Sequence, residues 1–326
     1  MNGQLLSISI AASVLLLGCS TETATPEPAP PAAVSFDHHD DQIDVMLAGE
    51  DFTTLYLSPQ GPVPYFHPLR AADGTIVSRQ YPMVEGVPGE SSDHPHHRGL
   101  WFNHNEVNGA NFWENADGAP NRADIVLKSV GAVGGDSLSV EFEWRAPDGK
   151  TVLTESRTVR FEQDGDVRTM DFDVTLAAGS EPVHFADTKE GSFAVRIADS
   201  MREQAVGGGP GQGVIVNAEG AQGEKNVWGK ASPWVDYSGP IGDKTYGIAI
   251  FDHPTNPKHP TYWHVRAYGL FAANIFGEHD FFSDPARDGS ITLQPGENLH
   301  FRYLVVLHAG DAEAGGIASR YAVWAR

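Results

Sequence analysis

The sequence predicts an all-β protein, a large antiparallel β-sandwich with a short helix at the C-terminus. Polar and apolar side chains alternate over residues 137–144, 151–161 and 167–176, and turn sequences rich in Asp and Gly separate these stretches. A period of two is typical of strands with one buried face, and tight turns make consecutive strands antiparallel. A helical pattern is confined to residues 311–324, where Ala, Glu, Arg and aromatic residues follow an Asp.

The rest of the chain continues the strand pattern. An Asp-Gly turn at 73–74 lies between residues 65–69 and 75–79, which predicts a hairpin. Further strands are expected at 246–251, 262–266, 290–293 and 299–307. We expect residues 37–326 to form a single β-sandwich domain, and a two-domain arrangement divided near residues 177–179 is the alternative.

Residues 1–19 predict an export signal. The uncharged, mostly apolar run from Leu5 to Leu17 has the length of a secretory signal, and it is shorter than the roughly 20 residues of a membrane-spanning helix. Gly18 and Cys19 end this run and resemble a bacterial lipobox, in which the cysteine is lipidated and becomes the new N-terminus. Cys19 is the chain's single cysteine, so its lipidation leaves no thiol for a disulfide or a catalytic nucleophile. The alternative is a cleaved signal with an incidental cysteine.

Residues 20–36 are expected to be a Pro-rich tether, because they hold four prolines and little that could be buried in a core. Ser20 follows the cysteine where an Asp would retain the protein, which resembles the pattern for outer-membrane delivery. We therefore expect an exported protein, lipid-anchored to the outer membrane and facing the periplasm, with the anchor as its only membrane contact. The net charge of −21 argues against a nucleic-acid partner, since binding phosphates requires Lys and Arg.

The densest polar cluster of the chain holds four of its fourteen histidines within eleven residues, from His94 to His104. His94 and His96 have a spacing common in zinc sites, and Asp93, Asn103 or His104 could complete the ligand set. The expected cofactor is therefore at most one divalent metal, bound by His94 and His96. The alternative is a rigid turn whose histidines bond to the main chain.

Three later segments also carry polar side chains suited to chemistry. Lys189 and Glu190 could form an ion pair, or Glu190 could act as a general base near a sugar hydroxyl; a solvated turn is the alternative. In the strand predicted at 262–266, alternation places Tyr262, His264 and Arg266 on one face, where aromatic rings stack on sugars and Arg bonds to their hydroxyls. Glu278 and the next residue, His279, form a plausible acid–base pair or a solvent-exposed loop.

Together these segments resemble a bacterial family named "methane oxygenase PmoA" or PmoA-like. The matching stretches are residues 93–102, 107–113, 187–191, 234–239, 252–256 and 263–274. Subunits of the true particulate methane oxygenase span membranes with many apolar helices, so we expect the label to be an artefact. Members of this family resemble secreted proteins of polysaccharide-using bacteria. The resemblance implies a β-supersandwich like that of galactose-mutarotase-like proteins, which bind sugars in a concave sheet lined with His, Arg and Glu.

The leading hypothesis is an exported carbohydrate-active enzyme that cleaves a glycosidic bond by hydrolysis or elimination in a concave β-sheet pocket, with epimerisation less expected. His97 or His264 would exchange protons with the substrate, and Glu190 or Glu278 would be the partner carboxylate. Substrate-binding residues would be Arg98, Asn103, Lys189, Tyr262, Arg266 and Asn274. A non-catalytic sugar-binding lipoprotein is the second hypothesis, and a metal-dependent oxidase, as the label suggests, is the third.

Overall fold

The computed structural model of the chain describes residues 33–57, 63–114 and 118–326. The predicted signal, Cys19 and most of the predicted tether lie outside the described residues, so their expected roles in export and anchoring stay predictions. Residues Ala32–Arg326 form one compact unit. Strand β1 begins at Val34, so the sheet starts within the segment expected to be tether.

The first large sheet is antiparallel and has eight strands in the order β1-β2-β3-β4-β5-β13-β18-β17. Its strands are β1 (Val34–His38), β2 (Gln42–Leu47), β3 (Glu50–Tyr56), β4 (Tyr65–His67), β5 (Leu100–His104), β13 (Gly191–Arg196), β17 (Tyr262–Val265) and β18 (Leu270–Asn274). Half of the sheet therefore comes from the N-terminal hairpins, and the half from β5 to β17 joins segments that are distant in sequence.

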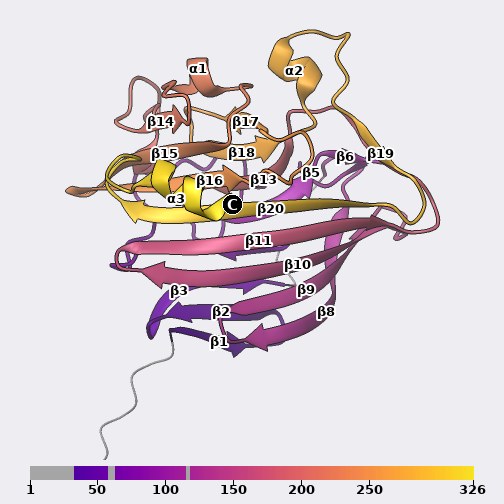
Figure 1. Cartoon of the computed structure of the whole chain (residues 1–326), viewed down its shortest axis with the longest axis horizontal. Helices are drawn as coiled ribbons and strands as arrows, with labels where there is room; N and C mark the ends of the chain where they lie inside the picture. The colour runs from indigo at the N-terminus through magenta and orange to yellow at the C-terminus, as the bar shows by residue number, and fades with distance from the viewer. Residues whose placement is uncertain (1–32, 58–62, 115–117) are drawn as a thin grey trace, which may run out of the picture. The chain divides into compact units, whose positions relative to one another are not determined.

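The second large sheet also has eight strands, in the order β14-β15-β16-β20-β11-β10-β9-β8. Its strands are β8 (Asp124–Gly134), β9 (Ser137–Arg145), β10 (Thr151–Asp164), β11 (Val167–Ala178), β14 (Val214–Asn217), β15 (Trp234–Ile241), β16 (Lys244–Asp252) and β20 (Asn298–Ala309). In Figure 1 these long strands run one above another from β15 down to β8. Both large sheets take strands from before and after residues 177–179.

The smaller elements of the described chain lie around these sheets. A four-stranded sheet is formed by β6 (Glu106–Val107), β7 (Ala110–Asn111), β12 (Val183–Phe185) and β19 (Ile291–Leu293). The helices are a 3₁₀ turn, η1 (Asp199–Met201), and α1 (Glu224–Val227), α2 (Glu278–Phe282) and α3 (Ile317–Trp324). None of the described helices is long and apolar enough to span a membrane.

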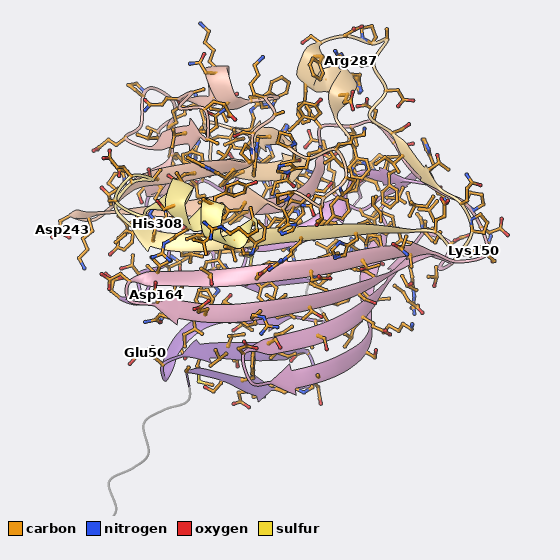
Figure 2. All side chains as sticks on the ribbon, viewed as in Figure 1. Glu50, Lys150, Asp164, Asp243, Arg287 and His308 are labelled. Carbon is orange, nitrogen blue, oxygen red and sulfur yellow. The ribbon has the colours of Figure 1, made fainter. Side chains whose placement is uncertain are left out.

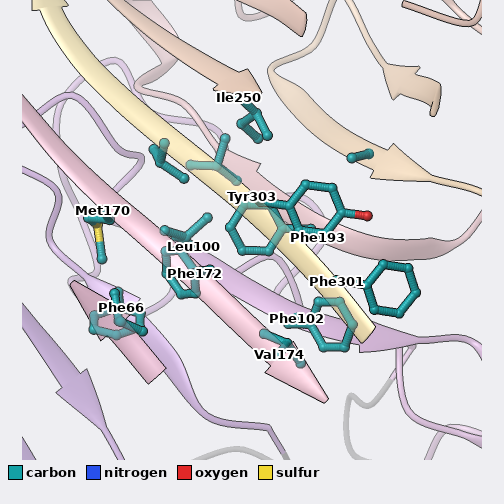
Figure 3. Packing of buried hydrophobic residues seen from close by; sticks show 14 of the residues in the cluster. Phe66, Leu100, Phe102, Met170, Phe172, Val174, Phe193, Ile250, Phe301 and Tyr303 are labelled. Atoms are coloured by element: carbon teal, nitrogen blue, oxygen red, sulfur yellow. The ribbon is translucent and has the colours of Figure 1, made fainter. Parts of the chain in front are cut away.

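Aromatic side chains from the facing sheets fill the core between them, as Figure 3 shows. Phe66 of the first sheet meets Phe172 of the second edge to face, with ring centroids 5.6 Å apart. Phe193 stacks on Tyr303 with a centroid distance of 4.8 Å. Because such rings bury large apolar areas, they hold the two sheets together as one sandwich and fix which face of each sheet points inward.

The all-β prediction is confirmed, and the expected meander of 137–176 is present as β9, β10 and β11 in adjacent positions. The hairpin expected around residues 73–74 is present as a short one. Arg70 forms an antiparallel bridge with Ile76, and the backbone N–H groups of Ala71 and Val77 donate to Thr75 O and Leu69 O at 2.9 Å. Its arms are shorter than expected, because β4 already pairs with β3 and β5 on its two edges.

The predicted C-terminal helix is present but shorter than expected, because it begins at Ile317 instead of residue 311. Two glycines precede it, and a side chain on Gly315 would lie 2.4 Å from the ring of His308. The chain therefore passes close to the sheet before the helix starts. In Figure 1, α3 lies across β16 and β20, where Ile317 packs against Phe251 and Val306.

Candidate functional site

The register of four neighbouring strands builds the floor of the site. Trp101 on β5 pairs with Ala194 on β13, which is aligned with Ala272 on β18 and then with His264 on β17. Tyr65 on β4 pairs with the other side of Trp101. Directly paired residues share a face of a sheet. The alternate residues of these strands enter the core of the sandwich, so this row lies on the outer face of the first sheet.

A loop of residues 80–98 crosses this outer face and carries the histidines. Its anchor is Asp93, whose Oδ1 accepts hydrogen bonds from Nη1 of Arg79 at 2.7 Å and from Nη2 of Arg196 at 2.9 Å. Both arginine side chains are fully buried, whereas the Asp93 side chain is 41 % exposed. Partial burial would raise the pKa of Asp93, but the hydrogen bond with His94 and the charges of Arg196 and Arg79 hold it well below its usual range.

A second carboxylate supports the same loop from beneath. Asp199 of η1 accepts a hydrogen bond from the backbone N–H of Ser91 and lies 3.3 Å from Nη1 of Arg202 and 3.8 Å from Nη2 of Arg196. Asp199 and Arg202 also line a cavity of about 460 Å³ behind the loop. The loop is thus held at Ser91 by the carboxylate of Asp199 and at Asp93 by two buried guanidiniums. These contacts position the histidines that follow.

The histidine rings form a stack with aromatic residues of the floor. His94 lies parallel to His97, with centroids 4.8 Å apart, and parallel to Tyr268 at 5.1 Å. His97 in turn stacks on Trp101 at 5.4 Å. The guanidinium of Arg196 lies over the Tyr268 ring, 4.9 Å from its centroid. Rings and cations in such an order restrain one another, so the loop presents a rigid surface.

The predicted catalytic His97 is 1 % exposed, because His94 and the floor residues cover it. Burial lowers the pKa of His97 well below its usual value, and neighbouring His96 and Arg196 add to this effect. Arg196 Nη1 lies 3.4 Å from His97 Nδ1, which suits a neutral ring that accepts a hydrogen bond at this nitrogen. His96 is partly exposed, and burial together with the charges around it lowers its pKa to about 4.

Lys189 and Glu190 lie in the loop that leads into β13. Lys189 Nζ is 3.6 Å from Glu190 Oε1 and 3.8 Å from Asp280 Oδ2, so one ammonium group faces two carboxylates. Burial raises the pKa of Glu190, although the charges of Lys189 and Arg266 oppose this shift. A side chain on the next residue, Gly191, would lie 2.6 Å from Nδ1 of His104, so only glycine fits beside Glu190.

At the other edge of the floor, His264 is also 1 % exposed. Trp228 donates a hydrogen bond from Nε1 to His264 Nδ1 at 3.3 Å, so the imidazole is neutral and its proton is on Nε2. Burial lowers the pKa of His264 to about 3, with smaller effects from Arg266 and Lys189. Arg266 lies 2.9 Å from Glu224 Oε1 and over the ring of Tyr268.

Tyr268 connects the two ends of the site. Burial raises its pKa to about 12, and the charges of Glu190 and Asp93 contribute to that rise while Arg196 and Arg266 oppose it. Carboxylates from both loops therefore act on one phenol. We use the term polar band for the accessible side chains of this region: His94, His96, Arg98, Lys189, Glu190, Arg266 and Tyr268.

Other predicted site residues have structural partners. Asn103 is buried and donates to the backbone oxygen of Phe112 at 2.6 Å. Asn274 is buried too; it donates to Thr188 O and accepts from Phe276 N, so it fastens the loop that carries Lys189 and Glu190. Both asparagines therefore shape the floor and its edge.

Tyr262 and Glu278 lie to the side of the polar band. The Tyr262 ring packs against Phe281 and Phe282 of α2, with centroids 5.8 and 5.4 Å away. The Glu278 carboxylate is bound by Lys258 Nζ at 2.9 Å and lies 3.7 Å from Arg287 Nη1. Arg287 lies beside α2 at the upper right of Figure 2. Glu278 thus ties α2 to neighbouring loops, and Asp280 is the α2 carboxylate that faces Lys189.

The predicted metal ligands lack a complete set of partners. The rings of His94 and His96 are 5.7 Å apart at an angle of 70°. Across residues 33–57, 63–114 and 118–326, no three His, Cys, Asp or Glu side chains are grouped so that they could hold a metal ion. A zinc site needs at least three protein ligands, so these two histidines do not fit one as they stand.

Several residues of the site were not predicted from the sequence. They are Tyr65, Arg79, Trp113, Arg196, Asp199, Arg202 and Glu224. Arg79 and Arg196 lie in otherwise apolar strand-like sequence, and a buried arginine requires an acidic partner. An Arg within an apolar stretch is a signal that could have identified them.

The chain belongs to the Family of unknown function (DUF6807), whose model matches residues 42–322. The expected PmoA-like family is therefore wrong, and the oxidase hypothesis loses the label on which it rested. No curated protein sequence matches the chain.

Solved structures similar to this chain include carbohydrate-active proteins. The GH36 α-galactosidase AgaA from Geobacillus stearothermophilus is 11 % identical with a TM-score of 0.40, over 85 % of this chain and 40 % of that one. A galactose mutarotase-like protein from Lactobacillus casei is 9 % identical with a TM-score of 0.39, over 84 % of this chain and 100 % of that one. This chain thus spans less than half of the α-galactosidase, and likeness of this degree supports no inference about activity.

Proposed function

We propose that this chain is an exported, lipid-anchored enzyme that cleaves a glycosidic bond at the polar band, by hydrolysis or elimination. The observation that carries the proposal is Glu190, a partly buried carboxyl with a raised pKa that lies 3.6 Å from Lys189 and in the field of Arg266, at the edge of an aromatic floor. A carboxyl that keeps its proton to higher pH than usual is suited to protonating a leaving-group oxygen. Glu190 is the proposed general acid.

The second group is assigned to Asp280 or His96. Asp280 faces Glu190 across Lys189, and a pair of carboxyls around one space is the usual arrangement for glycoside hydrolysis. His96 has a pKa of about 4, so its imidazole is neutral near pH 7 and could remove a proton in an elimination. His97 and His264 are buried and are positioning residues in this proposal. His97 stacks on His94 of the polar band, and His264 accepts a hydrogen bond from Trp228 and feels the charge of Arg266.

The test compares wild-type protein with Glu190→Gln on a panel of glycans. Product is measured as new reducing ends for hydrolysis and as ultraviolet absorbance of unsaturated sugars for elimination. We expect Glu190→Gln to lower turnover by about 10²–10⁴-fold, because general acid catalysis contributes that much, while binding changes little. The control is Glu162→Gln, an exposed glutamate on the outer face of the second sheet.

A non-catalytic sugar-binding lipoprotein is the second candidate. The burial of both predicted catalytic histidines favours it, because a binding protein needs the aromatic floor and the arginines but no proton transfer. Isothermal titration with the same glycans separates the two candidates. A glycan that binds wild-type and Glu190→Gln equally, and yields no product with either, would establish capture in place of cleavage.

A further inference from the structure

Among the residues that the structure describes, the cations at the polar band are paired with carboxylates with one exception. The cations of the band and of the buried network below it are Arg79, Arg98, Lys189, Arg196, Arg202 and Arg266. All except Arg98 lie within 4.0 Å of a carboxylate oxygen: that of Asp93, Glu190, Asp199, Glu224 or Asp280. Five of the six cations thus lie beside a carboxylate, and Arg98 does not.

Arg98 has few partners among the described residues. Its Nε donates a long hydrogen bond, 3.4 Å, to the backbone oxygen of Pro95. Its guanidinium lies 5.9 Å from the centroid of the Tyr65 ring, and Tyr65 stacks on Tyr56 with a centroid distance of 4.9 Å. Among the described residues, the Arg98 guanidinium therefore has the Tyr65 side chain as a hydrogen-bond partner but no carboxylate within 4.0 Å, although it is partly buried.

The position of Arg98 places this free charge next to the floor. It precedes Gly99 at the start of β5, and a side chain on Gly99 would collide with the backbone oxygen of Phe66 on β4. This close approach seats Arg98 over Tyr65, which pairs with Trp101 of the floor row. An aromatic surface and a guanidinium fork are therefore adjacent. Aromatic rings stack on the apolar face of a sugar, and the fork binds a planar anion through two hydrogen bonds.

The net charge of −21 makes a local cation such as Arg98 important for binding an anion. Such a protein repels anions at long range, but exposed charges beyond about 8 Å are screened at physiological salt. Recognition of an anionic ligand must then come from a local, unneutralised cation. We infer that Arg98 binds a carboxylate or sulfate group of the ligand, which makes the ligand an acidic glycan. This inference rests on the proposed sugar-binding function of the polar band.

The experiment measures binding by isothermal titration for matched oligosaccharides that carry a uronic acid carboxylate, the same sugars reduced to the neutral alcohol, and sulfated equivalents. Wild-type protein is compared with Arg98→Gln, Arg98→Lys and the control Arg160→Gln. Arg160 is an exposed arginine on the second sheet whose loss changes the net charge equally. Arg98 makes a long hydrogen bond to Pro95 and contacts Tyr65, but it has no carboxylate partner among the described residues, so we expect its variants to melt within a few degrees of wild type.

We expect wild-type protein to bind an acidic sugar at least about 10-fold more tightly than its neutral counterpart, since bonds to charged groups are worth that much. Arg98→Gln should lose this preference, Arg98→Lys should keep part of it, and Arg160→Gln should keep all of it. The carboxylated and sulfated arms show which anion is bound. If wild-type protein and Arg98→Gln each bind acidic and neutral sugars equally well, the inference about Arg98 is overturned and the proposed function is not. If no sugar binds to any of the proteins, the proposed function is overturned as well.

Discussion

Replacing Asp93 by alanine tests whether one carboxylate holds the histidine loop in place. The substitution removes two hydrogen bonds to the buried guanidiniums of Arg79 and Arg196, at 2.7 and 2.9 Å. A hydrogen bond to a charged group contributes about 1.5–3 kcal/mol, and because the Asp93 side chain is 41 % exposed we take the lower end for each bond. The expected loss in the free energy of unfolding is about 3 kcal/mol, or roughly 6–12 °C in melting temperature.

The loss is measured by urea unfolding and by thermal melts followed by circular dichroism. Asp148→Ala is the control, since Asp148 makes an exposed ion pair with Lys150 and accepts an exposed hydrogen bond from its backbone N–H, and its loss should cost less than about 1 kcal/mol. The pKa of Asp93 is held below its usual range in the folded protein. Its contribution is therefore present above the unfolded pKa of about 3.9 and is lost as the pH falls further. The difference between variant and wild type should narrow below about pH 4, and an Asp93→Ala protein as stable as the control at pH 7 would refute the reasoning.

Three further predictions concern other parts of the sandwich and the band. Gly191→Ala should destabilise the protein by about 1–3 kcal/mol, measured by urea unfolding, because the added methyl group would lie 2.6 Å from His104 Nδ1. Asp236→Ala should cost about 3–5 kcal/mol in the same assay, since it strips His308, 2.7 Å away and fully buried, of its partner; an unchanged midpoint would contradict this. Lys189→Met should raise the pKa of Glu190 further, so the alkaline limb of a pH–rate profile should move to higher pH if Glu190 acts as an acid. A shift of the acidic limb to higher pH, with the alkaline limb unchanged, would assign Glu190 as a base.

Local patterns predicted much of the fold. Alternation in 137–176 identified β9, β10 and β11, because a strand with one wet face must place polar residues at every second position. The same rule placed His264 and Arg266 on one face of β17, and both do border the site. Local rules predicted the turn at residues 73–74 but made its arms too long, since how far a segment pairs depends on which strand edges other segments already occupy.

The sequence did not predict which polar side chains are buried or which groups they contact. His97 and Arg98 are neighbours in the chain, yet the first is covered by His94 and the floor while the second lies free over Tyr65. Glu190 and Glu278 were equal candidates by residue type. In the structure, Glu278 is bound by Lys258 at 2.9 Å and ties α2 to a neighbouring loop, whereas Glu190 lies 3.6 Å from Lys189 in the polar band and burial raises its pKa.

The sequence by itself determined an all-β chain and the set of imidazoles, guanidiniums and carboxylates available to a site. It could do so because strand periodicity and side-chain chemistry are properties of neighbouring residues. Only the tertiary structure decided which of these groups face one another, because the row from Tyr65 to His264 joins strands that are far apart along the chain. Protonation and accessibility follow from that packing, through the water it excludes and the charges it brings together.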